Sequence, residues 1–245
     1  MSDIYKPQDA MSLWLPGSGP GQQPSPRLIG QVFLADGNRK VGLEYAPQWI
    51  AQGFALSEDL PLARGVFLPK ERDMAAGAVD DARPDRWGER VIRNIYKPAR
   101  LSVLEYLYFA GDGRFGALGV SLDPGSYQPC SGGALASLAS LSDMQRAIAA
   151  VLADEKLDEA MVRLVKPGPS FGGVRPKSLI EMDGSQWLVK FSQGEDLDTE
   201  LLEHASMRLA AQCGFRLPKR VRCHCPVGMR WRSIGLTAQM QGVRM

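Results

Sequence analysis

Hydrophobic residues in the first half of the chain follow first a strand-like and then a helix-like spacing. Residues 28–34 and 41–45 are predicted strands, and the Asp36-Gly37 pair between them favours the positive φ angles of a hairpin turn. Apolar residues then recur at helical spacing between Pro84 and Pro98, which predicts a helix with one buried face. Ser102 followed by Glu105 predicts the capping box of a second helix.

The second half continues with helices and then returns to a strand pattern. Ser142 and Gln145 predict another capping box, and a short helix is expected over 157–164. Residues 178–182 and 186–191 are predicted strands around an Asp-Gly turn. A helix is expected beyond them, ended by Gly214, with a buried side made by four residues. These are Leu202, Ala205, Met207 and Leu209.

The sequence therefore contains both strand and helix patterns, and no internal repeat. Residues 1–26 are rich in Pro and Gly and are predicted to form a flexible leader, although Leu13 to Leu15 can dock as an edge strand. The last 23 residues match neither the helix nor the strand period. We therefore expect that segment to form no regular element.

Composition narrows the class of protein further. With 245 residues, a net charge of +2 and four cysteines, the sequence is typical of a cytoplasmic protein without a disulfide framework. It carries no signal peptide pattern and no apolar run long enough to cross a membrane. Eight Lys or Arg residues lie between Thr199 and Met245 against two Glu. These charges form no helical stripe and lack interleaved aromatics, so direct nucleic-acid binding is not expected.

One stretch points to chemistry. The segment Ser170-Phe-Gly-Gly-Val-Arg-Pro-Lys177 is Gly-rich, and Gly172-Gly173 lets the backbone approach a ligand closely. Lys177 adds a positive charge at its exit. Lys190 follows on a predicted strand and Glu203 on a predicted helix. A Gly-rich loop, a strand lysine and a helix glutamate, in this order, form the phosphate end of the ATP site in kinase-like folds.

Each of these features also has a simpler interpretation. A diglycine is common in ordinary turns, a strand lysine is commonly a surface residue, and Glu203 can simply complement the helix dipole. The combination in one order favours the nucleotide interpretation. An unrelated P-loop NTPase is disfavoured, because Pro176 replaces the glycine that precedes Lys-Ser in that loop and no Walker B aspartate is found.

The sequence resembles the HipA-type serine/threonine kinases, the toxin half of bacterial type II toxin–antitoxin systems, over about residues 27–222. The resemblance rests on seven short motifs spread over that range. They are Tyr45-Ala-Pro-Gln-Trp-Ile50, Leu56-Ser-Glu-Asp-Leu-Pro-Leu62, Pro84-Asp-Arg-Trp-Gly88, Gly116-Ala-Leu-Gly119, Gly172-Gly-Val-Arg-Pro-Lys177, Trp187-Leu-Val-Lys-Phe191 and Glu203-His-Ala-Ser-Met207.

This resemblance implies an α+β fold, a HipA-like N-terminal subdomain followed by an incomplete kinase-like N-lobe, with the domain bounds that follow. Residues 1–26 are the leader, 27–125 a HipA-like N-terminal subdomain, and 126–165 a connector with helices. Residues 166–222 are a partial, incomplete kinase-like N-lobe that binds ATP, and 223–245 an aberrant tail.

The resemblance also implies a site, cofactors and partners. Lys190 and Glu203 match the family's phosphate-binding lysine and its helix partner, and Ser170 matches a serine that some relatives phosphorylate. With Gly172, Gly173 and Lys177 they form the expected ATP-binding set. The family uses ATP and Mg²⁺, phosphorylates proteins, and pairs with a small helix-turn-helix antitoxin of HipB type. It contacts DNA only indirectly, through that antitoxin.

Phosphoryl transfer in such folds also needs an Asp near the acceptor hydroxyl and Asp or Asn ligands for Mg²⁺. No Asp occurs after Asp198. We therefore expect a truncated kinase that lacks the catalytic lobe and is inactive alone, after a frameshift near Val221 to Gly228 that the gene's nucleotide sequence tests. The alternative is a non-enzymatic partner-binding module of a split toxin–antitoxin system. A Cys-His-Cys zinc site at Cys223–Cys225 is disfavoured, because no second ligand pair completes it.

Overall fold

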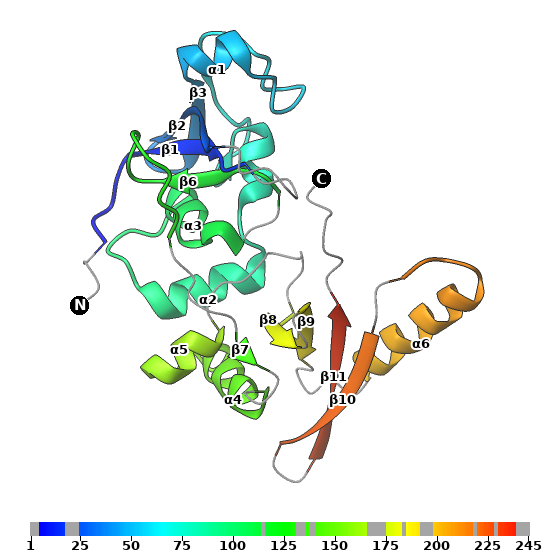
Figure 1. Ribbon diagram of the computed structural model, residues 1–245. Coiled ribbons are helices and arrows are strands. Elements are labelled where there is room, and N and C mark those ends of the chain that lie inside the picture. The colour runs from blue at the N-terminus through cyan, green and yellow to red at the C-terminus, as the bar shows by residue number, and fades with distance from the viewer. Residues whose placement is uncertain are drawn as a thin grey trace.

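The computed structural model describes residues 5–17, 25–113, 116–130, 136–137, 141–165, 175–182, 185–191, 198–217, 220–227 and 230–238. Within these residues the chain forms two sheets, each packed against helices (Figure 1). The mixed architecture confirms the predicted α+β class. No helix in the described part of the chain is both long and apolar enough to span a bilayer.

The first sheet is built from short antiparallel strands with one parallel addition. Its strands are β1 (Ala10–Leu15), β2 (Arg27–Ala35), β3 (Lys40–Tyr45), β4 (Val66–Phe67), β5 (Met74–Ala75) and β6 (Gly119–Ser121). The order is β4-β3-β2-β1-β6, and β5 pairs with β3 in parallel. The β2–β3 hairpin confirms the turn prediction, since Asp36 and Gly37 both have positive φ.

The position of β1 differs from the expectation of a flexible leader with an edge strand. β1 lies inside the sheet between β2 and β6, and Met11 and Leu13 are almost completely buried. A strand with neighbours on both sides gains two ladders of backbone hydrogen bonds, and here it also gains apolar packing. Residues 10–15 are therefore an integral part of the first sheet.

Five helical segments accompany this sheet. They are α1 (Pro47–Gln52), the 3₁₀ turn η1 (Gly77–Ala82), α2 (Arg86–Tyr96), α3 (Val103–Phe109) and the 3₁₀ turn η2 (Gly111–Gly113). Asp85 caps α2 by accepting a hydrogen bond from the Gly88 amide at 2.7 Å. The predicted capping box of α3 is confirmed, with Ser102 and Glu105 bonded reciprocally.

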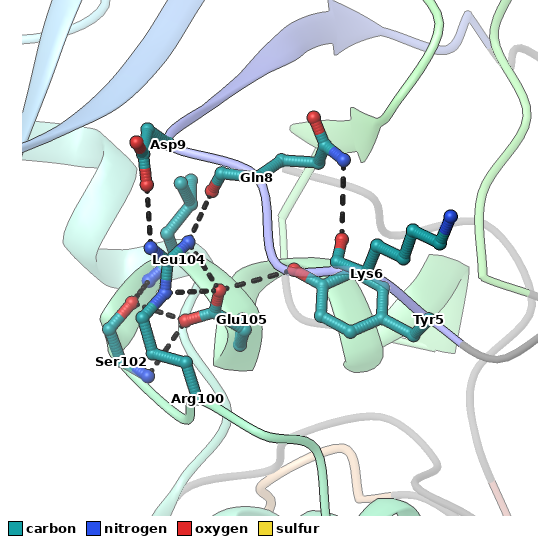
Figure 2. Close-up of polar contacts among 8 residues, drawn as sticks. All are labelled: Tyr5, Lys6, Gln8, Asp9, Arg100, Ser102, Leu104 and Glu105. Atoms are coloured by element: carbon teal, nitrogen blue, oxygen red, sulfur yellow. Dashed lines mark hydrogen bonds and ion pairs between the residues drawn. The ribbon is translucent and has the colours of Figure 1, made fainter.

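Glu105 also fixes the beginning of the described chain, as Figure 2 shows. Its side chain is fully buried and accepts hydrogen bonds from the Tyr5 hydroxyl at 3.1 Å and from Arg100 Nε at 3.0 Å. Arg100 reaches onward to Asp9 and to the Gln8 carbonyl. Burial, and next the Glu105 charge, raise the pKa of Tyr5, so the phenol stays a donor.

The second sheet belongs to the second half of the chain. Its strands are β7 (Ala136–Ser137), β8 (Lys177–Met182), β9 (Ser185–Phe191), β10 (Arg220–Val227) and β11 (Arg230–Ala238), in the order β10-β11-β9-β8-β7. The helices are α4 (Leu141–Leu152), α5 (Glu159–Val165) and α6 (Thr199–Gln212). Ile180, Val189 and Phe191 are buried in one apolar cluster with residues of α4.

Three expectations for this half were wrong. α4 already begins at Leu141, so Ser142 lies within its first turn and not at the predicted N-cap position. Residues expected to form no regular element make the β10–β11 hairpin, whose second strand pairs with β9. The apolar side predicted for α6 is not buried: Leu202 and Leu209 are 53% and 62% exposed.

Helix α2 takes part in both halves of the molecule (Figure 1). Trp87 and Val91 belong to the apolar cluster of the second sheet and α4, whereas Ile92 packs in a cluster with residues of α3. One helix therefore shares its side chains between two cores. Such sharing transmits a shift of one body to the other, because packed cores deform little.

Candidate functional site

Lys190 and Glu203 form the centre of the candidate site. Lys190 projects from β9, and Glu203 lies one turn into α6. The ammonium donates to both carboxylate oxygens, at 2.7 and 2.9 Å, and the two side chains are 30% and 34% exposed. The sequence order placed these residues on adjacent elements, and the structure brings them into contact. Their role in binding nucleotide stays a prediction.

The local sequence explains why the lysine points toward α6. Trp187, Val189 and Phe191 are buried on one face of β9, so the alternation of a strand turns Lys190 to the other face. Asp198 caps α6 by accepting a hydrogen bond from the Leu201 amide at 2.8 Å. The cap fixes where the helix starts and thereby sets the position of Glu203.

Lys177 is held by a contact that the sequence did not suggest. Its ammonium lies 2.5 Å from Oδ2 of Asp85, the residue that caps α2, and both side chains are more than 90% buried. Trp87 Nε1 donates a hydrogen bond to the Lys177 carbonyl oxygen at 3.0 Å. The structure thus shows Lys177 engaged with the N-terminal half of the chain. Its role in binding phosphate stays a prediction.

Arg175 adds a second contact near the start of β8. Its guanidinium lies 3.8 Å from Glu200 and donates to the Thr199 hydroxyl, both in the first turn of α6. Glu200 is buried, whereas the Arg175 side chain is 41% exposed, so only the carboxylate side of this contact is removed from water. Arg175, just before β8, thus connects this strand to the first turn of α6, the helix that carries Glu203.

Three members of the predicted ATP-binding set, Ser170, Gly172 and Gly173, lie outside the described residues. Sequence reasoning missed Asp85 and Trp87 as parts of this region. Both belong to the Pro84–Gly88 motif, which had been noted only for its resemblance to a family. The sequence did offer a signal. Within five positions this motif holds a residue suited to cap a helix, Asp85, and an aromatic hydrogen-bond donor, Trp87.

The arrangement suits recognition of an anionic group. The Lys190 ammonium is partly exposed, and the Glu203 carboxylate fixes its orientation. A strand lysine and a helix glutamate form the same kind of pair in kinase-like folds, where the lysine binds phosphate. The described residues do not fit a Mg²⁺ site, because no three His, Cys, Asp or Glu side chains among them gather to hold a metal ion.

Comparisons with known proteins find one family model that matches part of the first half of the chain. Residues 25–121 match the family model of the HipA N-terminal domain. Among curated proteins, none shows significant similarity to this sequence.

One similar solved structure is HipA of Shewanella oneidensis MR-1, from a complex of a toxin–antitoxin system with HipB and operator DNA. It is 18% identical with a TM-score of 0.49, and the match covers 93% of this chain and 50% of that chain. This chain thus spans about half the length of that HipA. The match over residues 25–121 shows that the chain carries a HipA-type N-terminal portion.

Proposed function

We propose that this chain is the ATP-binding part of a HipA-type toxin serine/threonine protein kinase. The observation that carries the proposal is the contact, at 2.7 and 2.9 Å, between Lys190 on strand β9 of the second sheet and Glu203 on helix α6. In kinase-like folds this pair holds the lysine against the α- and β-phosphates of ATP. The HipA N-terminal domain over residues 25–121 supports the same family context.

The proposal assigns nucleotide binding, but not phosphoryl transfer, to these 245 residues alone. The sequence contains no Asp after Asp198, so a catalytic Asp and Asp ligands for Mg²⁺ are absent from the positions where the family pattern needs them. The ATP-binding set then consists of Lys190 and Glu203 with the Gly-rich segment at Ser170, Gly172 and Gly173. The purified chain is expected to bind ATP without turning it over.

A partner follows from the same family context. A small helix-turn-helix antitoxin of HipB type is the proposed partner, a protein is the proposed substrate of the complete kinase, and contact with operator DNA would run through the antitoxin. The net positive charge of residues 199–245 is not required for this proposal.

Isothermal titration calorimetry of the purified chain with ATP tests the proposal. We expect saturable binding, weakened about tenfold in Lys190→Met, because a charged hydrogen bond to phosphate contributes about 1.5–3 kcal/mol. A γ-phosphate transfer assay on the same protein is expected to show no turnover. Absence of saturable binding in the wild-type chain overturns the ATP-binding role, and robust turnover overturns the inactive state.

The second candidate is a non-enzymatic partner-binding module of a split toxin–antitoxin system. It is favoured by the apolar surface of α6 and the residues after it, where Leu202, Leu209 and Phe215 are 53–67% exposed. Large exposed apolar patches commonly mark interaction sites. A chain that captures its antitoxin or a second kinase lobe without binding ATP favours this candidate over the first.

A further inference from the structure

Lys177 and Lys190 are direct cross-strand partners in the antiparallel β8–β9 pair. Residues opposite each other in such a pair point to the same face of the sheet, with Cβ atoms about 5 Å apart. Two like charges in this arrangement repel and destabilise the pair. In the structure each ammonium forms an ion pair with a different carboxylate: Lys177 pairs with Asp85, and Lys190 pairs with Glu203.

The carboxylate that forms an ion pair with Lys177 comes from the N-terminal half of the molecule. Asp85 precedes α2, 92 residues before Lys177 in the sequence, and the Trp87 indole holds the backbone of the same lysine. Farther along α2, Arg90 donates to the Leu152 carbonyl at 2.6 Å and thereby caps the end of α4. The start of β8 is therefore fixed by α2 through both its side chain and its main chain.

We infer that Asp85, Trp87 and Lys177 form an interdomain latch, in which Asp85 is the positioning residue for the Lys190–Glu203 pair and Lys177 is not a phosphate ligand. Asp85 holds the Lys177 ammonium away from Glu203, so that Glu203 is left to orient Lys190. Through this latch the HipA N-terminal domain controls the geometry of the second sheet. The link to ATP affinity rests on the proposed function, whereas the latch itself does not.

Three variants test the latch: Asp85→Asn, Lys177→Met and the double variant. Asn keeps the N-cap of α2, and Met keeps the volume of the lysine stem, so each change removes mainly charge. Asp85→Asn leaves a buried ammonium without its carboxylate, and the unfolding midpoint should fall by about 10 °C. In the double variant neither charge is left buried, and most of that loss should be recovered.

ATP affinity, measured by calorimetry well below each unfolding midpoint, separates positioning from folding. Asp85→Asn should bind ATP about fivefold more weakly, because the unmatched Lys177 charge acts on Lys190 and Glu203. Lys177→Met and the double variant should stay within about twofold of wild type, as expected when no phosphate contact is removed.

The other outcomes are equally distinct. A large affinity loss in Lys177→Met that persists in the double variant overturns the inference, because it makes Lys177 a ligand. Wild-type affinity in folded Asp85→Asn also overturns it. If wild type binds no ATP, the proposed function fails, and the latch is then decided by the midpoints: absence of recovery in the double variant overturns it.

Discussion

Lys177 and Lys190 lie directly opposite each other on β8 and β9, yet they hold different carboxylates in different parts of the molecule. The Lys177 pair is buried and reaches back to the N-terminal half, whereas the Lys190 pair is partly exposed and lies between β9 and α6. The degree of burial determines how much each ion pair contributes to the free energy of unfolding. A buried pair costs several kcal/mol to break, and an exposed one contributes about 1 kcal/mol or less.

Replacing Glu203 by Gln should therefore affect ligand binding more than folding. We expect the free energy of unfolding to change by less than about 1 kcal/mol, since the pair is about one-third exposed. ATP affinity should fall about fivefold, because Lys190 loses the carboxylate that orients it. Urea unfolding and calorimetry measure the two effects. Glu181→Gln, an exposed change on β8, is the matched control and should alter neither.

The sequence predicted those features that depend on neighbouring residues. The hairpin turn at Asp36, the capping box of α3 and the glycine stop of α6 at Gly214, which has a φ of 88°, all follow from local backbone chemistry. The Lys190–Glu203 contact was also foreseeable, because only a strand-to-helix connection separates the two residues.

Long-range features escaped prediction. Nothing near Asp85 indicates that it meets Lys177, because the partner lies 92 residues away. β1 was predicted as an edge strand, since its place between β2 and β6 depends on a strand more than 100 residues later. The β10 strand had a usable signal, the alternation of Val221, Cys223, Cys225 and Val227, which the irregular pattern of the following residues obscured.

Glu105 should be among the most sensitive positions for folding. It is fully buried, and Glu105→Gln replaces a carboxylate that neutralises Arg100 and accepts from Ser102 and Tyr5. We expect the free energy of unfolding to drop by about 3 kcal/mol, since the Arg100 guanidinium would keep only the exposed Asp9 as its counter-charge. Chemical denaturation measures the loss. The exposed Glu44 on β3 gives the control, and equal effects of Glu44→Gln and Glu105→Gln would contradict this assignment.

Glu89 on α2 should make stability depend on pH. Burial raises its pKa above 4.5, while Arg83, 3.3 Å away, opposes the shift. A carboxyl with a raised pKa in the folded state contributes stability that is present below 4.5 and is lost as pH rises through its folded pKa. Glu89→Gln removes this titration. The free energy of unfolding of the variant, relative to wild type, should therefore be higher at pH 7 than at pH 4.

Denaturant unfolding of both proteins at the two pH values measures this difference. The exposed Glu71→Gln provides the matched control, for which the difference between variant and wild type should barely change with pH. A Glu89→Gln difference that is constant, or that reverses in sign, contradicts the role assigned to burial.

The exposed apolar surface of α6 should control self-association. Leu202 and Leu209 are more than half exposed, and burying such side chains against another molecule gains about 25 cal/mol per Å². Leu202→Gln with Leu209→Gln removes the apolar surface and keeps helix propensity, so folding should be little affected. Sedimentation velocity should show oligomers of the wild-type chain that are reduced in this variant. Leu122→Gln, at an exposed position in the first domain, should leave the oligomers unchanged, and a monodisperse wild-type monomer would refute the prediction.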